Sequence, residues 1–255
     1  MPLPQAADGG PTAFGLIVIG DEVLNGTRTD KHLAVFKETL RAQGHTLAWH
    51  WVLPDDADVL TAHLRFSIGL GGPVFCCGGI GATPDDLTRA CAAAAAGVEL
   101  VRHPEAQALI EGRYGSDAYP HRVLMADLPA GSTLIPNPVN RIPGFRLAGH
   151  WFLPGFPQMA WPMARWVLSE HFATTTPPTE VALEVLGVPE SGLIPVMREL
   201  GVRFPALKMF SLPHLGDDPH ILLGFRGRGG LDEALEALRH ELDLRSMAYR
   251  APAGD

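Results

Sequence analysis

The stretch 74–88 constrains the fold of this chain more than any other. Residues 74–77 are apolar and favour a buried strand, and the loop that follows them contains Gly78, Gly79 and Gly81. Glycine adopts positive φ angles without strain and, having no Cβ, lets a ligand approach the backbone closely. We therefore predict a buried strand that ends in a glycine loop accessible to a ligand.

A helix start is expected directly after this loop. Thr83 is the expected N-cap, Pro84 the first helical residue and Asp86 the third, in a Thr-x-x-Asp capping box. The N–H groups and the positive end of the dipole at such a helix start bind anions. Asp85 and Asp86 would repel a phosphate unless a cation bridges them, and capping alone is the alternative role of both. The spacing fits neither a G-x-G-x-x-G fingerprint nor a Walker A loop.

Alternating strand and helix signals organise the rest of the chain. Over residues 14–172 they predict a three-layer α/β/α domain around a mostly parallel sheet. Residues 180–247 follow a β-α-β-β-α pattern, which predicts a second, small α+β domain. We expect residues 1–13 to be a disordered leader, 173–179 a linker and 248–255 a tail.

Polar residues follow two of the predicted strands. Gly20, Asp21 and Glu22 come directly after the strand 14–19, and Asp55 lies at the corner after the next strand. Ligands of open α/β sheets bind at the carboxyl ends of the strands, so these residues are site candidates. A solvated turn or a helix cap is the alternative role for such acids.

The region 116–149 is rich in Pro and Gly and carries three further candidates. Asn137 and Asn140 are polar candidates for the site, and Arg141 could supply a positive charge for a phosphate. The alternative for Arg141 is an ordinary surface position.

The charge balance and the cysteine content narrow the class of protein. The chain has 255 residues, with 28 acidic against 20 basic residues and a net charge of −8, which argues against a surface that coats nucleic acid. Its 3 cysteines form no Cys-x-x-Cys pair and suggest no disulfide framework, as in a reducing compartment. No apolar run reaches the length of a membrane span. We expect a cytoplasmic protein with neither a nucleic-acid nor a membrane partner.

Four ordered stretches resemble a known family: residues 19–26, 78–88, 136–145 and 153–157. Together they are similar to the molybdopterin-binding domain shared by MoaB and Mog proteins, gephyrin and the N-terminal part of competence/damage-inducible protein A (CinA), with the CinA branch the most similar. Residues 180–247 resemble the small KH-like domain that follows in CinA proteins. No Gly-x-x-Gly loop stands between two helices there, so we expect a structural or dimer-forming role.

The resemblance implies a cleft that binds molybdopterin or an adenylated, pyrophosphate-bearing ligand. It implies catalytic roles for Asp55 and Asp86, which would also hold Mg²⁺ or another divalent cation. It further implies a homo-oligomer, either a dimer or a trimer. The residues expected to bind the ligand are Gly20, Asp21, Glu22, Gly78, Gly79, Gly81, Thr83, Asp85, Asn137, Arg141, Pro143, Gly144, Pro154, Gly155 and Pro157.

Two alternative functions stay open beside ligand binding. CinA N-terminal domains are also associated with metal-dependent ADP-ribose pyrophosphatase activity, and a regulatory or scaffold protein without catalysis is the third possibility. The sequence departs from the CinA pattern at 30–32, which read Asp-Lys-His instead of Asp-Thr-Asn, and at 140–141, which read Asn-Arg. The C-terminal amidase domain of longer CinA proteins has no counterpart here, so we expect no deamidation of nicotinamide mononucleotide. We favour the binding function.

Overall fold

The computed structural model describes residues 11–252, and the chain forms two compact units, Met1–Thr175 and Thr176–Asp255. The elements of the first unit are β1 (Ala13–Ile19), α1 (Asp21–Leu24), α2 (His32–Ala42), β2 (Thr46–Leu53), α3 (Ala57–Leu70), β3 (Val74–Cys77), α4 (Thr88–Ala96), β4 (Leu100–Arg102), α5 (Pro104–Tyr114), the 3-10 helices η1 (Gly115–Ala118) and η2 (Arg122–Ala126), β5 (Asp127–Pro129), β6 (Thr133–Ile135), β7 (Gly144–Leu147), β8 (His150–Leu153) and α6 (Pro157–His171). Those of the second are β9 (Thr179–Leu186), α7 (Glu190–Arg203), β10 (Lys208–His214), β11 (His220–Gly227), α8 (Leu231–Leu244) and β12 (Tyr249–Arg250).

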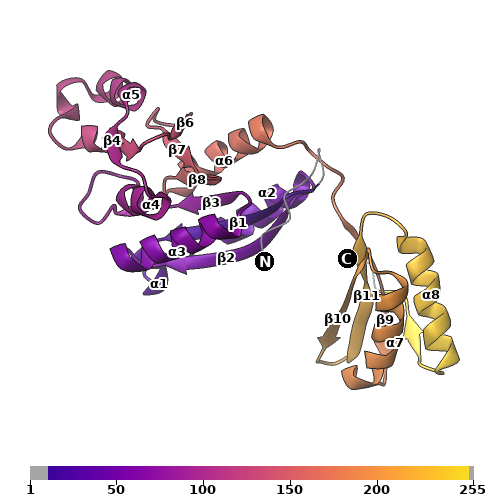
Figure 1. Ribbon diagram of the computed structural model, residues 1–255. Coiled ribbons are helices and arrows are strands. Elements are labelled where there is room, and N and C mark those ends of the chain that lie inside the picture. Colours follow the sequence, from indigo (N-terminus) through magenta and orange to yellow (C-terminus); the bar gives the residue numbers. More distant parts are fainter. Residues whose placement is uncertain (1–10, 253–255) are drawn as a thin grey trace. The chain divides into compact units, whose positions relative to one another are not determined.

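A six-stranded sheet in the order β2-β1-β3-β8-β7-β6 forms the centre of the first unit (Figure 1). Strands β2, β1, β3 and β8 run parallel, and β7 and β6 are added antiparallel at one edge. The four residues of β3 and the four of β8 are all buried, as expected for strands that are covered on both faces.

Helices cover both faces of this sheet. Side chains of α3, α4 and α5 pack in one apolar cluster with alternate residues of the strands, including Ile17 and Cys76. Side chains of α2 and α6 pack in a second cluster with Leu16 and Phe75. Neighbouring strand residues point to opposite faces, so one sheet supplies both cores. The predicted three-layer α/β/α fold with a mostly parallel sheet is confirmed.

The second unit is a four-stranded antiparallel sheet in the order β10-β11-β9-β12. Helices α7 and α8 pack on the face that carries Leu183, Val185, Leu223 and Phe225. The predicted β-α-β-β-α order is confirmed, and β12 is an additional strand. Residues 248–255 are therefore not simply a tail, because Tyr249 and Arg250 pair with Val185 and Glu184 of β9.

Two other expected boundaries shift by a few residues. Residues 1–10 of the expected leader lie outside the described part of the chain, while Ala13 already pairs with Thr46 in the sheet. Thr179, the last residue of the expected linker, pairs with Gly227 as the first residue of β9. Both shifts have the same cause, since the backbone of these residues forms ladder hydrogen bonds that composition alone does not reveal.

Candidate functional site

A cavity of about 440 Å³ opens at the carboxyl ends of the parallel strands, beyond Ile19 of β1 and the ends of β2, β3 and β8. This is the edge at which open α/β sheets bind ligands, and the volume lies in the range of small-molecule pockets. It brings together most of the residues predicted from the sequence. These are Gly20, Glu22, Asp55, Gly78, Gly79, Gly81, Thr83, Asp85, Asp86, Asn137, Pro143, Pro154 and Gly155.

Gly78 is the point at which three strand ends meet. Its N–H donates to the Leu153 carbonyl of β8 at 3.0 Å. Its φ angle is 119°, and a Cβ at this position would lie 2.2 Å from the Ile19 carbonyl oxygen of β1. Any larger residue would push β1 and β3 apart, so glycine is required for the sheet and not only for the loop.

The amides of Gly79, Ile80, Gly81 and Ala82 donate to no protein acceptor in the described part of the chain. All four residues line the cavity. Consecutive N–H groups without an acceptor bind anions, and these four border a cavity. The loop therefore offers hydrogen-bond donors to a ligand.

The expected helix start at Thr83 is wrong, because α4 begins only at Thr88. The Asp86 Oδ2 atom accepts from the Thr83 N–H at 2.8 Å and from the Thr83 hydroxyl at 2.5 Å, and the Asp86 N–H donates to the Thr83 carbonyl. The two residues close a separate turn on each other instead of capping a helix. At the start of α4, the Thr88 N–H donates to the Gly79 carbonyl and the Thr88 hydroxyl donates to the Gly78 carbonyl. Anion binding would therefore come from the loop amides and not from the helix end.

Hydrogen bonds from the buried side chain of Arg89 hold this loop in place. Its guanidinium, which is 8% exposed, donates to the carbonyls of Gly81 at 2.7 Å and Asp127 at 3.1 Å, and also to that of Leu124. A single buried cation thus joins the glycine loop to the segment 124–127.

Asp55 lies at the polar end of the cavity, where its backbone and side chain pair with those of Asp21. The Asp21 N–H donates to Asp55 Oδ2 at 3.0 Å, and the Asp55 N–H donates to Asp21 Oδ1 at 3.3 Å. Burial raises the pKa of Asp55, and the charges of Asp21, Glu22 and Asp85 raise it further against the lowering effect of the Asp21 N–H. Asp21 therefore acts on the cavity through Asp55, since its own side chain is not part of the lining.

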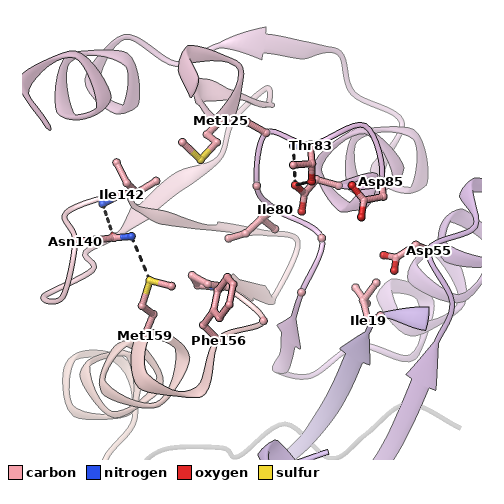
Figure 2. Close-up of a pocket in the computed structure, with 18 of the residues that line it drawn as sticks. Ile19, Asp55, Ile80, Thr83, Asp85, Met125, Asn140, Ile142, Phe156 and Met159 are labelled. Atoms are coloured by element: carbon pink, nitrogen blue, oxygen red, sulfur yellow. Dashed lines mark hydrogen bonds between the residues drawn. The ribbon is translucent and has the colours of Figure 1, made fainter. Parts of the chain in front are cut away.

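Asp85 rather than Asp86 is the electrostatic partner of Asp55. The charge of Asp85 contributes to the raised pKa of Asp55, whereas Asp86 directs Oδ2 at Thr83. Figure 2 shows the carboxylates of Asp55 and Asp85 across the polar part of the cavity. A shared cation would therefore lie between Asp55 and Asp85.

Asn137 contributes a buried amide group to the cavity lining. The residue is 4% exposed, and its Oδ1 accepts from the Val139 N–H at 3.0 Å. Its Nδ2 is buried without a hydrogen-bond partner among the described residues. An unpaired buried donor costs about 1–3 kcal/mol, and because Nδ2 itself is buried, a ligand acceptor would remove that cost after a small movement of the side chain.

The opposite wall of the cavity is apolar. Figure 2 places Met125, Ile142, Phe156 and Met159 on this side, away from Asp55 and Asp85. Asn140 orders the wall without offering groups to a ligand, because its Nδ2 donates to the Met159 sulfur at 3.2 Å and its Oδ1 accepts from the Ile142 N–H at 2.9 Å. Thioether and aromatic groups pack well against a flat ring.

Three predicted ligand-binding residues besides Asp21 do not line the cavity. Arg141 has a φ angle of 66° and lines a separate hollow beside α5 instead of this cavity. Gly144 lies within the sheet, paired with Ile135. Pro157 begins α6 and lines a neighbouring hollow.

The cation at the rim is Arg28, which the sequence reasoning missed. It lines the cavity and pairs with Glu22 at 3.5 Å. The apolar wall, with Tyr114, Ile80 and the residues of Figure 2, was also missed as a ligand surface. The nearest available signal was the Met and aromatic content of the stretch 156–166, which favours core packing as strongly as it favours a site.

Residues 15–174 match the family model described as "Probable molybdopterin binding domain". The chain belongs to this family. CinA-like proteins are among its relatives: those of Citrifermentans bemidjiense and Geobacter sp. strain M21 are 30% and 31% identical to it, each across 92% of this chain. The chain spans 61% and 58% of the length of these two relatives.

Other relatives are similar in length to this chain. Protein PAE0875 of Pyrobaculum aerophilum is 32% identical over 72% of this chain and 73% of its own length. Among solved structures, that of the protein CinA of unknown function from Thermoplasma acidophilum superposes with a TM-score of 0.58 at 27% identity, over 63% of this chain and 99% of that one. Within residues 11–252, no helix combines the length and the apolar character that crossing a membrane requires.

Proposed function

We propose that the cavity binds a molybdopterin-like or adenylated ligand that joins a flat ring to a phosphate or pyrophosphate. The observation that carries the proposal is a set of unpaired donors among the residues that line the cavity, the amides of Gly79 to Ala82 and the Nδ2 atom of Asn137. These groups suit phosphate and ring acceptors. The wall around Phe156 and Met159 suits the ring.

The negative charge of the chain makes a cation necessary for such a ligand. Arg28 at the rim supplies one positive charge, and we propose that Asp55 and Asp85 hold a divalent ion such as Mg²⁺. The residues fit the ion, because burial and, after it, the charges of neighbouring acids raise the pKa of Asp55, and a cation beside the carboxylate opposes both effects. Mg²⁺ takes one or two carboxylates and completes its shell with water and phosphate oxygens, and when bound it neutralises phosphate charge. Asp86, the partner expected from the sequence, instead keeps its bond to Thr83.

A second candidate function is hydrolysis of a dinucleotide pyrophosphate such as ADP-ribose. The observation in its favour is the raised pKa of Asp55, which makes this carboxylate a better proton acceptor for an attacking water than an ordinary Asp. In this reaction Asp55 would take a proton of the water as its oxygen bonds to the adenylyl phosphorus, the bridging P–O bond would break, and AMP and ribose 5-phosphate would be released. The amides of 79–82 would bind the phosphate oxygens.

A thermal-shift screen of the full chain separates these functions. The probes are a pterin pyrophosphate, AMP and ADP-ribose, each with and without Mg²⁺, and a ligand at about 100 times its Kd stabilises by about 2.7 kcal/mol. We expect stabilisation by phosphate-bearing probes that Mg²⁺ enhances in the wild type and not in Asp55→Asn. Absence of any shift from all three probes would refute the binding function, and release of AMP from ADP-ribose that is lost in Asp55→Asn would favour the hydrolase.

A further inference from the structure

A second group of ionisable side chains lies in the C-terminal unit, apart from the cavity. Glu184 belongs to β9, His220 opens β11, and Asp218 lies in the turn that precedes it. One oxygen of each carboxylate and one ring nitrogen of His220 all lie within 4.8 Å of one another. This is the one such group of three found among residues 11–252.

The ring of His220 is oriented in the way that a metal-binding histidine requires. Its Nδ1 lies 2.8 Å from the Asp218 carbonyl oxygen, and since a carbonyl only accepts, Nδ1 carries the hydrogen. In the neutral ring Nε2 then presents a lone pair, 3.8 Å from Glu184 Oε1. Metal-bound histidines commonly donate their second ring nitrogen to a backbone carbonyl, which fixes the ring as it is fixed here. The ring of His214, stacked at 4.6 Å, restricts the plane further.

The charges of the group also favour an added cation. Arg250 of β12 donates through Nε to Glu184 Oε2 at 2.5 Å and contacts Asp218 through Nη2. Glu184 is only 6% exposed, and its Oε1 lies 3.8 Å from Nε2 of His220, so a cation between these two atoms would contact both.

We propose that Glu184, Asp218 and His220 bind one zinc-class divalent ion. The ligand set of one imidazole and two carboxylates suits Zn²⁺, which binds nitrogen and oxygen at about 2.0–2.2 Å, with water in the fourth position. Ligand atoms around such an ion lie about 3.4 Å apart, so atoms within 4.8 Å need only small side-chain rotations to bind it. Asp218, the most exposed of the three, has the freedom to move.

The ion would connect three parts of the sheet. It would join the β10–β11 turn to Glu184 of β9. The short strand β12 lies beside this point, where its Arg250 pairs with Glu184 and donates to the Glu184 carboxylate. The role inferred is structural, as in small domains that use a metal to fix a hairpin. The site is independent of the function proposed for the cavity, and it also differs in metal preference, because an imidazole ligand selects Zn²⁺ over Mg²⁺.

The test uses the full chain with Asp55→Asn and Asp85→Asn, which removes the metal site proposed for the cavity. After treatment with a chelator, the protein is dialysed against Zn²⁺ in excess Mg²⁺, and bound zinc is measured by elemental analysis and titration. We expect one zinc per chain. Adding His220→Gln or Asp218→Asn is expected to weaken binding by more than about 100-fold, the upper end for loss of an outer-shell group alone. Adding His240→Gln, on an exposed position of α8, should leave binding unchanged.

Two results would overturn the proposal: no zinc bound by the chain that carries only the two cavity substitutions, or equal zinc affinity after His220→Gln. Circular dichroism of each variant shows whether it is folded. Asp218→Asn keeps the test valid if His220→Gln does not fold, because the Asp218 side chain is 63% exposed and the change is isosteric.

Discussion

Replacing Asn137 by alanine separates the ligand role of its amide from any structural role. The substitution removes the buried Nδ2 that has no partner, which relieves about 1–3 kcal/mol. It also removes the Oδ1 bond to the Val139 N–H, which contributes about 0.5–1.5 kcal/mol. Val139 is 55% exposed, so water can replace the lost acceptor. The free energy of unfolding is therefore expected to stay constant or to rise by up to about 2 kcal/mol, unlike most changes of a buried residue to alanine.

Ligand affinity is expected to move in the opposite direction. Loss of a hydrogen bond to a charged phosphate oxygen costs about 1.5–3 kcal/mol, or about 10- to 150-fold in Kd, and loss of a bond to a neutral ring carbonyl about 2- to 10-fold. Isothermal titration with a pterin pyrophosphate in Mg²⁺ measures the affinity, and urea unfolding measures the stability.

Asn140→Ala is the matched control for this experiment. Asn140 lines the same cavity, but both of its amide groups already pair with Met159 and Ile142. We expect this variant to lose stability by about 1 kcal/mol, with a smaller effect on affinity than Asn137→Ala. The reasoning fails if Asn137→Ala destabilises the protein by more than about 1.5 kcal/mol while the ligand binds as tightly as before.

Three further substitutions test the framework of the cavity. Asp55→Asn should raise the free energy of unfolding at pH 7, because a raised pKa of Asp55 means that the folded state disfavours the charged carboxylate. This advantage over the wild type should shrink as the pH falls through the folded-state pKa and vanish below the ordinary value of 3.8. Urea unfolding between pH 7 and 3 measures it. Gly78→Ala should lower the free energy of unfolding by more than about 3 kcal/mol, as measured by thermal unfolding. Gly97→Ala is the control, also at positive φ but with no atom within 4 Å of the added Cβ, and should cost only about 1–2 kcal/mol. Equal losses would refute the predicted clash. Arg89→Met should cost about 3 kcal/mol and speed amide hydrogen exchange at Thr88, whose N–H donates to the Gly79 carbonyl of the loop; unchanged exchange there would show that Arg89 does not hold the loop.

Local patterns in the sequence predicted the parts of the fold that depend on local chemistry. The apolar run 74–77 gives β3 with the bounds that the structure has, and Asp56 caps α3 through its bond to the Val59 N–H as a strand-end acid commonly does. The start of α4 was mispredicted because Thr83 and Asp86 bond to each other, which satisfies the capping pattern without a helix. Sequence alone does not distinguish these two outcomes.

The composition of the cavity depended on contacts that no local pattern encodes. Arg28 and Arg141 are both isolated basic residues in loops, yet the structure brings Arg28 to the cavity and turns Arg141 towards α5. The role of Asn137 became visible only once its surroundings showed a buried Nδ2 without a partner. Asp55 lines the cavity, as the family resemblance led us to expect, but only the structure shows that the charge acting on it comes from Asp85 and not from the adjacent Asp86.

The three carbonyl contacts of Arg89 bear on how quickly a ligand can be accepted. They tie the donor loop to the segment that carries Met125, so the two sides of the pocket are held at a set spacing before any ligand arrives. A preorganised pocket loses little conformational entropy on binding, and its association rate is not limited by a folding or closing step. The same contacts would limit how far the gap can widen for the proposed ligand, because the glycine loop and the segment 124–127 could separate only by breaking bonds to the buried guanidinium.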